Sequence, residues 1–328
     1  MSHTAEIKNS FAAQVRATPG GEYLEACFSC GTCVSKCMIQ QKIEPDYNPR
    51  QLLRLVMLED REEAFSSPTT WLCSACDLCY PACPQEIHIS DVIGAVKQLA
   101  VEAGYKSPLE TVSVDEALCA GCGICGMACP YEAPSLIEKP VNGQIDRVAT
   151  VDANKCMGCG TCVAACPLGA ISRPGVSNQE ITEQLYSPIP ANGKPRLVIF
   201  ICDWCLRADA DVQLLEGYPE NIRVIHIPCS GRIDPEMALL SLRSGIDGVL
   251  ICGCMPGECH YKRGTMVSAC KIGLLEQMLD QMKNEAISVN RNDSSRVRFV
   301  QIGTRDRGRI RAEVDAMLGH LSSLKEVA

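Results

Sequence analysis

One cysteine pattern, Cys-x-x-Cys-x-x-Cys-x-x-x-Cys, occurs four times in this chain of 328 residues. Three thiolates separated by two-residue gaps can wrap one face of an iron–sulfur cubane, while the fourth ligates a second cluster. Two runs therefore make a reciprocal pair, and four runs make two pairs. Structural zinc sites use two separated cysteine pairs instead, so the pattern predicts four 4Fe–4S clusters. The sixteen cysteines are Cys27, Cys30, Cys33, Cys37, Cys73, Cys76, Cys79, Cys83, Cys119, Cys122, Cys125, Cys129, Cys156, Cys159, Cys162 and Cys166.

The composition favours metal binding over disulfide formation. The chain has 23 cysteines, an odd number, and its N-terminal stretch lacks the apolar segment of a secretory signal. We therefore expect a cytoplasmic protein, where thiols stay reduced and such spacing indicates metal. No apolar run approaches the roughly 18 residues that span a bilayer, so no direct membrane insertion is expected.

The net charge of −8 lies entirely in residues 1–195, because acidic and basic residues balance in the remainder. Carboxylates in this region could face a basic partner or form an ordinary solvated surface. Phosphate binding needs a basic excess, which is absent, so no nucleic-acid partner is expected.

Residues 1–110 are expected to form an α-helical ferredoxin domain, because helical patterns rather than strands separate the first two runs. Asn48 and Pro49 suit the cap and first turn of one helix. Ser90 and Gly104 suit the start and end of another. The expected ligand sets are Cys27, Cys30 and Cys33 with Cys83, and Cys73, Cys76 and Cys79 with Cys37.

Residues 111–175 contain the other two runs in a nearly duplicated block. The segments VSVDEALCAGCGICGMACP and VATVDANKCMGCGTCVAACPLGAIS align as a repeat, each with a short β-rich lead-in. Pro130 and Pro167 follow the last cysteine of each run, as in the bacterial Cys-Pro pattern. The block resembles the bacterial two-cluster ferredoxin, an α+β fold. That resemblance implies one cluster on Cys119, Cys122, Cys125 and Cys166, and another on Cys156, Cys159, Cys162 and Cys129.

After a linker expected over residues 176–195, residues 196–328 predict an open-sheet α/β domain. The segments RLVIFIC, NIRVIHIP, GVLICG and VRFVQIG are typical of buried parallel strands, with helical patterns between them. Cysteines follow three of these strands, and ligand sites in such sheets collect at the carboxyl ends of strands. These cysteines are Cys202, Cys205, Cys229, Cys254 and Cys259.

Four of these five thiols are expected to bind metal, and spacing does not say which one is spare. Four thiolates suit a 2Fe–2S cluster or a structural zinc, and ligand softness does not choose between them. Cys252 on a strand and Cys270 on a helix are expected to be core thiols.

Four polar residues lie close in sequence to the C-terminal cysteines. His260 suits either a hydrogen-bond donor behind a ligand or a residue at a helix start. Arg232, Lys262 and Arg263 could raise the potential of a nearby cluster or contact a partner, and a solvated surface is the default expectation for each.

Two further segments resemble known families. The segment GTCVSKC with WLCSACDLCYPACP is similar to the iron–sulfur C subunit of heterodisulfide reductase and to the α-helical ferredoxin domain of succinate dehydrogenase. The segments CDWC, PCSGRIDPE and DGVLICGCMPGECHY resemble the delta subunit of methyl-viologen-reducing hydrogenase. This second resemblance implies a 2Fe–2S cluster in the C-terminal domain. One departure is Met38 after Cys37, where the first family usually has proline.

These resemblances predict an electron-transfer subunit of a cytoplasmic oxidoreductase complex, with no substrate site of its own. The implied partners are a flavoprotein like the A subunit of heterodisulfide reductase, a hydrogenase or dehydrogenase donor, and a terminal reductase like its B subunit or of another kind; a partner flavin could bifurcate electrons. No GxGxxG follows a strand and no Walker loop occurs, so no flavin or nicotinamide is expected here. A free-standing polyferredoxin carrier is the alternative, and a redox or metal sensor is a third hypothesis.

Overall fold

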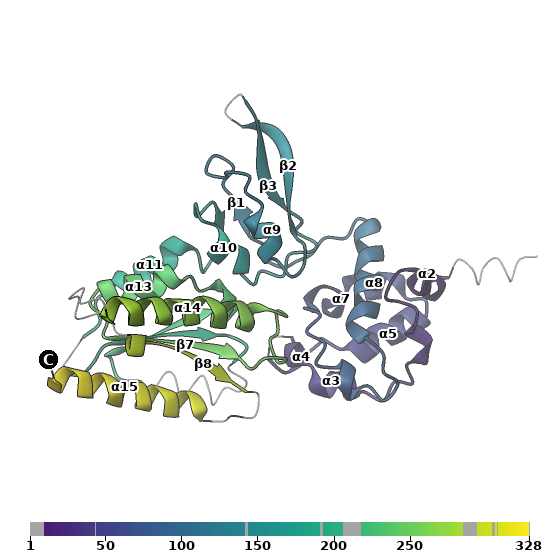
Figure 1. Ribbon diagram of the computed structural model, residues 1–328. Coiled ribbons are helices and arrows are strands. Elements are labelled where there is room, and N and C mark those ends of the chain that lie inside the picture. The colour runs from purple at the N-terminus through teal and green to yellow at the C-terminus, as the bar shows by residue number, and fades with distance from the viewer. Residues whose placement is uncertain are drawn as a thin grey trace, which may run out of the picture. The chain divides into compact units, whose positions relative to one another are not determined.

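The computed structural model describes residues 10–42, 44–141, 144–190, 193–205, 218–284, 294–303, 306 and 308–327. The chain forms two compact units, Met1–Leu109 and Glu110–Ala328, and both are drawn in Figure 1. Within the described ranges, no helix is long and apolar enough to cross a lipid bilayer.

The first unit is built from short helices, and its described residues contain no strand. The α-helices are α2 (Phe11–Ala17), α3 (Thr32–Lys36), α4 (Met38–Lys42), α5 (Pro49–Met57), α6 (Arg61–Ser66), α7 (Pro68–Leu72) and α8 (Ile89–Glu102), and two 3-10 turns are η1 (Leu24–Ala26) and η2 (Tyr80–Ala82). Its core includes Phe65, which packs edge-to-face on Phe11 at a centroid distance of 5.3 Å and accepts a 2.8 Å hydrogen bond from the Trp71 indole.

Helix α5 begins where the sequence predicts. The Asn48 side chain accepts a hydrogen bond of 3.0 Å from the Gln51 backbone, and Pro49 occupies the first turn. These contacts satisfy a backbone N–H group that has no partner within the helix. Leu52 and Val56 are then buried on one face, as their helical spacing requires.

Helix α8 ends as predicted but begins differently. Gly104 follows its last turn with a φ of +92°, the left-handed conformation that favours glycine. The expected cap at Ser90 is wrong, because the helix starts at Ile89 and His88 takes the cap position. The Ser90 hydroxyl instead donates to the Asp77 carboxylate in the second cysteine run. A contact 13 residues away in the chain has therefore replaced a local one.

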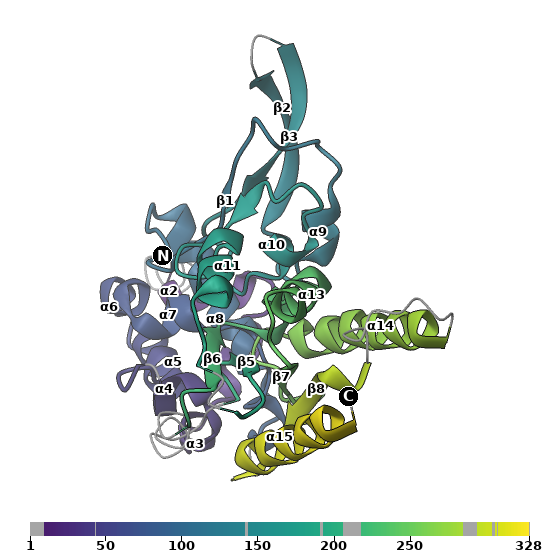
Figure 2. The same cartoon turned by 90° about the vertical axis from the view of Figure 1, so that its left-hand side faces the viewer.

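The second unit contains the other two cysteine runs and a parallel sheet. Its first part comprises β1 (Ser113–Val114), α9 (Ile124–Ala128), β2 (Pro134–Val141), β3 (Gln144–Val151), α10 (Thr161–Ala165) and β4 (Ile171–Ser172). Strands β1 and β4 pair antiparallel, and β2 and β3 form a hairpin in which Pro134 lies opposite Val151. Figure 2 shows this hairpin projecting from the cysteine-bearing loops. The repeat in the sequence predicts the two β-rich lead-ins, which lie in β1 and at the end of β3, but not the long hairpin.

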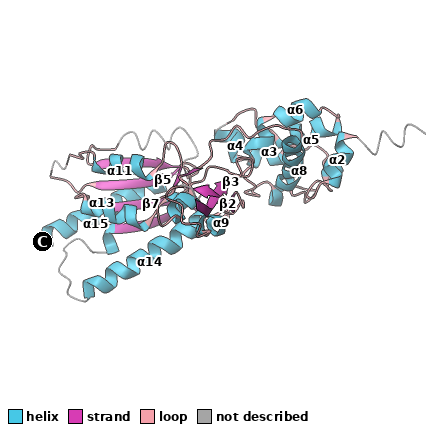
Figure 3. Cartoon of the chain, turned by 90° about the horizontal axis from the view of Figure 1, so that it is seen from above, coloured by secondary structure: helices cyan, strands magenta, loops and turns pink. Residues whose placement is uncertain are grey.

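The C-terminal part is the open parallel sheet that the sequence predicts. Its strands are β5 (Leu197–Cys202), β6 (Ile222–Ile227), β7 (Gly248–Cys254) and β8 (Val297–Ile302), in the spatial order β6-β5-β7-β8. Helices α13 (Pro235–Arg243) and α14 (Gly264–Asn284) cover one face of the sheet and α15 (Arg309–Val327) covers the other, as Figures 1 and 3 show. Both faces are therefore buried, which explains the continuous apolar strands.

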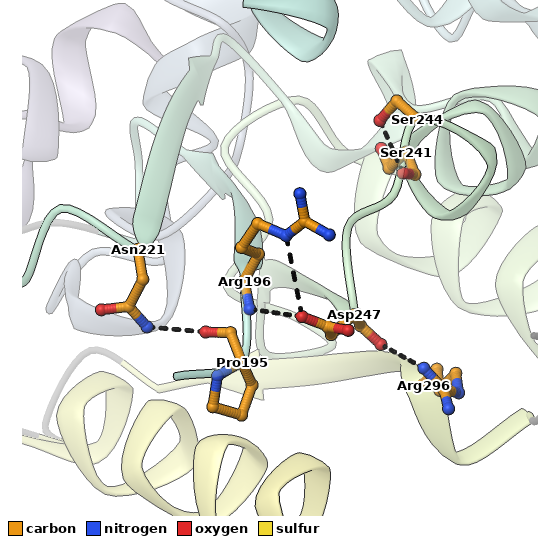
Figure 4. Close-up of polar contacts among 7 residues, drawn as sticks. All are labelled: Pro195, Arg196, Asn221, Ser241, Ser244, Asp247 and Arg296. Carbon is orange, nitrogen blue, oxygen red and sulfur yellow. Dashed lines mark hydrogen bonds and ion pairs between the residues drawn. The ribbon is translucent and has the colours of Figure 1, made fainter. Parts of the chain in front are cut away.

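Polar contacts fix the amino ends of these strands (Figure 4). Asn221 donates a 2.6 Å hydrogen bond to the Pro195 carbonyl, which joins β6 to β5. The Asp247 carboxylate accepts one of 2.7 Å from the Arg196 backbone, and its carbonyl accepts one of 3.3 Å from Arg296. These contacts tie the starts of all four strands, so the carboxyl ends are left for the cysteines.

The segment expected to be a linker contains a packed helix. Helix α11 (Asn178–Tyr186) has a complete capping box, formed by Ser177 and Glu180. Its Ile181 and Leu185 side chains are fully buried in the core that covers the sheet. Residues 176–195 are therefore part of the C-terminal fold over most of their length. The Pro, Ser, Asn and Gly content of this segment favours a linker, whereas two apolar residues at helical spacing indicate the helix that forms.

We predict that Ile181→Ala lowers the free energy of unfolding by about 2–5 kcal/mol, because it leaves a cavity in a closed core. Gln184→Ala, on the exposed side of the same helix, should change it by less than about 0.5 kcal/mol. Calorimetry on the anaerobically purified protein measures both. If the two variants had the same melting temperature, helix α11 would not be packed against the sheet.

Candidate metal centres

The first unit gathers one set of four thiols in a hollow near its surface. Cys27, Cys30, Cys33 and Cys83 line this hollow together with Arg50. The first three come from the loop before α3 and from its first turn, and the fourth follows η2. The set thus combines three cysteines of the first run with the last cysteine of the second.

A second set in the same unit is more deeply buried. Cys73, Cys76 and Cys79 lie close enough to Cys37 for their charges to act on one another. Burial raises the pKa of Cys73 to about 11 and raises that of Cys79 further. The Tyr47 hydroxyl hydrogen-bonds Cys73 and Cys37 and partly opposes this effect. Four partly buried thiols that resist ionisation together suit a positively charged metal group, which stabilises their thiolate forms.

The second unit repeats this arrangement. Cys119, Cys122, Cys125 and Cys166 line a hollow, as Cys27, Cys30, Cys33 and Cys83 do in the first unit. Backbone N–H groups of Ala149 and Ala170 donate to the sulfurs of Cys119 and Cys166 at 3.3 Å. Such N–H···S hydrogen bonds tune the potential of a bound cluster.

The remaining cysteines of these runs form a fourth set. Cys129 and Cys156 act on the charge of Cys159, and all three act on Cys162. The last three thiols are buried, in contrast to the exposed Cys122 of the neighbouring set. We call this fourth set the inner set and the set of Cys122 the outer set. Each of the four sets has the membership that the sequence predicts, and cluster binding by them stays a prediction.

The five C-terminal thiols also meet at one place. The sulfurs of Cys202, Cys205 and Cys254 all lie within 4.8 Å of one another, with 4.0 Å between Cys202 and Cys254 and 3.9 Å between Cys205 and Cys254. Cys229 hydrogen-bonds both Cys202 and Cys259. We call these five residues the C-terminal set. They lie at the carboxyl ends of β5, β6 and β7, and the strand order changes direction between β5 and β7, as expected for a ligand site.

Hydrogen bonds within the C-terminal set favour the thiolate form of two sulfurs and raise the pKa of the other three thiols, Cys205, Cys229 and Cys254. The pKa of Cys202 is held well below its ordinary value because Cys205, Cys229 and Cys254 hydrogen-bond its sulfur. A hydrogen bond from Cys229 likewise lowers the pKa of Cys259 to about 6. Thiolates are the metal-binding form of cysteine, so this donor set fits a 2Fe–2S cluster or zinc.

Close packing surrounds this set. A Cβ atom on Gly264, the first residue of α14, would lie 1.9 Å from the Cys229 sulfur, so only glycine fits there. His260 stacks on the Trp204 indole at a centroid distance of 3.3 Å, and both rings are buried. His260, next to Cys259, therefore packs on Trp204, which lies between Cys202 and Cys205 in the sequence.

Two expectations about single residues are wrong. Arg232 is 0 % exposed rather than solvated, because the first part of the unit covers it. Cys270 is exposed on α14 rather than in the core, whereas Cys252 is fully buried on β7 as expected. Lys262 and Arg263 are exposed, as the default expectation has it.

Comparison with known proteins matches three segments of the chain to known families. Residues 197–325 match the family model "Methyl-viologen-reducing hydrogenase, delta subunit". Residues 118–170 and 23–87 each match a model for a 4Fe–4S dicluster domain. The two cysteine-rich segments are therefore of the 4Fe–4S type.

Individual relatives come from three kinds of subunit. The chain is 41 % identical over 93 residues to the iron–sulfur D subunit of the F420-non-reducing hydrogenase vhc of Methanococcus voltae, which covers 28 % of this chain and 65 % of that protein. It is 34 % identical over 102 residues to the C subunit of the H(2):CoB-CoM heterodisulfide,ferredoxin reductase of Methanothermobacter marburgensis, over 31 % of this chain and 54 % of that protein. A 36 % identity over 116 residues links it to the A subunit of the ferredoxin:CoB-CoM heterodisulfide reductase of Methanosarcina mazei, over 34 % of this chain and 15 % of that protein.

The chain thus spans less than two thirds of the length of these curated relatives. It is related to iron–sulfur subunits of hydrogenases and to subunits of heterodisulfide reductases.

We predict that Cys205→Ala removes about two iron atoms per chain if the C-terminal set binds a 2Fe–2S cluster. Cys252→Ala is the matched control, because this thiol is equally buried, and its pKa is raised to about 12 by burial. Metal analysis of anaerobically purified variants measures both. Loss of one zinc instead of iron would establish the structural-zinc alternative, and equal loss from both variants would argue against a site at Cys205.

Proposed function

We propose that this chain is the iron–sulfur electron-transfer subunit of a cytoplasmic oxidoreductase complex of the heterodisulfide reductase and hydrogenase type. Four 4Fe–4S clusters and one 2Fe–2S cluster, when bound, supply one-electron carriers along the chain. The observation that carries this proposal is the gathering of five separate thiol sets in one polypeptide.

In this proposal the ligands are the sixteen cysteines of the four runs and four of the five thiols in the C-terminal set. The match of residues 197–325 to a hydrogenase delta subunit supports a 2Fe–2S cluster over zinc. We assign residues 1–110 to an α-helical ferredoxin domain, 111–175 to a two-cluster ferredoxin domain and 196–328 to the delta-subunit-like domain. The role of this chain's own residues is to hold and bury the redox groups at fixed positions.

The relatives support three kinds of partner. A flavoprotein like the A subunit of heterodisulfide reductase contacts the delta-subunit-like domain, a hydrogenase or dehydrogenase donates electrons, and a reductase like the B subunit or of another kind accepts them. A flavin in the partner allows flavin-based electron bifurcation. The segmental matches to the D, C and A subunits of such complexes support this arrangement.

A free-standing polyferredoxin is the second candidate, and the surface around the outer set argues against it. Leu118, Ile124, Met127 and Leu168 are exposed large apolar side chains that neighbour these cysteines in sequence, and Met127 is 76 % exposed. Several exposed apolar side chains around one thiol set favour a surface that a partner covers. On a free-standing soluble carrier these apolar side chains would stay exposed to water, which is unfavourable.

We predict that the native protein, purified anaerobically by a pull-down, contains about 18 iron atoms per chain, from four 4Fe–4S clusters and one 2Fe–2S cluster. Flavin and further subunits should copurify. Iron, sulfide, zinc and flavin are assayed on one sample. About 16 iron atoms with one zinc, no flavin and no partner would overturn the proposal in favour of the polyferredoxin.

A further inference from the structure

The two parts of the second unit meet at a closely packed junction. Arg232, in the 3-10 turn η3 (Ser230–Arg232), is completely buried there. Its guanidinium donates hydrogen bonds of 2.8 Å to the Val176 carbonyl and to the Asn178 side chain. A Cβ atom on Gly160 would lie 2.7 Å from Cδ of Arg232. The arginine stem therefore lies directly against the backbone that follows Cys159.

Backbone segments from two thiol sets touch at this junction. A Cβ atom on Gly231 would lie 2.8 Å from the Thr161 hydroxyl oxygen. Gly231 is two residues from Cys229 of the C-terminal set, and Thr161 is two residues from Cys159 of the inner set. The path between the two sets thus consists of two residues on each side and one van der Waals contact. Glycine at position 231 permits this close approach.

A second clamp lies beside the first. Lys271, on α14, reaches from the C-terminal part and donates a 3.2 Å hydrogen bond to the Ala164 carbonyl in the last turn of α10. Helix α10 carries Cys162 of the inner set. Arg232 and Lys271 together fix the position of this helix against the C-terminal fold.

One aromatic ring lies near both thiol sets. Tyr131 follows Cys129 by two residues, and the Lys262 ammonium lies 5.5 Å from its ring centroid. The phenol is close enough to Cys159 of the inner set and to Cys229 and Cys259 of the C-terminal set for their charges to act on it.

We infer that the inner set and the C-terminal set form a directly coupled electron-transfer pair, and that Arg232 is the positioning residue that holds them together. The inference rests on the proposed function. The step moves one electron, so one centre is oxidised as the other is reduced, and no bond forms or breaks. The outer set, with Cys122 exposed, is then the end of this unit from which electrons enter or leave.

The repeat supplies a matched pair of variants for the test. Cys159 and Cys122 are the second cysteines of equivalent runs, so Cys159→Ala should remove the inner cluster and Cys122→Ala the outer one. In the fully reduced full-length protein, electron paramagnetic resonance should show a 2Fe–2S signal broadened by magnetic interaction with a neighbouring cubane. Cys159→Ala should abolish this broadening, and Cys122→Ala should leave it.

Arg232 is tested without changing a ligand. We predict that Arg232→Met keeps full iron content but weakens the magnetic interaction. It should also shift the inner cluster to a more negative potential, because a cation near Cys162 is lost. Arg232→Lys should restore much of the potential, since the charge is kept. Arg243→Met, which removes an exposed cation on α13, should change neither quantity.

The outcomes separate this inference from the proposed function. A wild-type protein with about 18 iron atoms and an unbroadened 2Fe–2S signal would overturn the inference alone. Loss of the broadening in Cys122→Ala but not in Cys159→Ala would also overturn it. Zinc in the C-terminal set would overturn both, because zinc carries no electron.

Discussion

The fold of both units depends on the exchange of a fourth cysteine between paired runs. Each thiol set takes three cysteines from one run and the last cysteine from another, as in the hollow of Cys27, Cys30, Cys33 and Cys83. Neither run of a pair can complete its set alone, so helices and turns between the runs must bring the ends together. In the first unit this exchange joins α3 to η2, and in the second it joins α9 to α10. The cysteine sets thus replace part of the hydrophobic core in segments that contain few aromatic residues.

In the C-terminal part, a parallel sheet brings thiols from separate segments together. Polar contacts around Asp247 fix the amino ends of the strands, and apolar residues bury both faces. The opposite ends are free to present thiols at the place where the strand order reverses. The polar contacts at the amino ends make the sheet a rigid frame, which holds the sulfurs at the other end in fixed positions. Fixed ligand positions let the surroundings of a metal centre tune its properties.

Much of the site follows from local sequence spacing. Three members of each set and the parallel sheet could be predicted locally, because Cys-x-x-Cys gaps and apolar strand runs involve residues that are neighbours in the chain. The fourth member comes from a distant run, and for the second unit the resemblance to a two-cluster ferredoxin implied it. The cap of α8 could not, because Asp77 competes for Ser90 from a distant loop. Helix α11 was missed because its burial depends on a sheet formed by later residues. The stacking of Trp204 and His260 also has no local signal, since 56 positions separate the two rings in the sequence.

The sequence by itself determined the cysteine runs, their 4Fe–4S type and most of the segments that are helical or extended. Tertiary structure alone decided which thiol sets are neighbours. The inner and outer sets have similar sequences, yet among the described residues it is the inner set that abuts the C-terminal fold at Arg232 and Lys271. The physical reason is that burial of a charged side chain requires hydrogen-bond partners from distant segments, here Val176 and Asn178 for Arg232. Residue spacing along the chain does not predict these contacts.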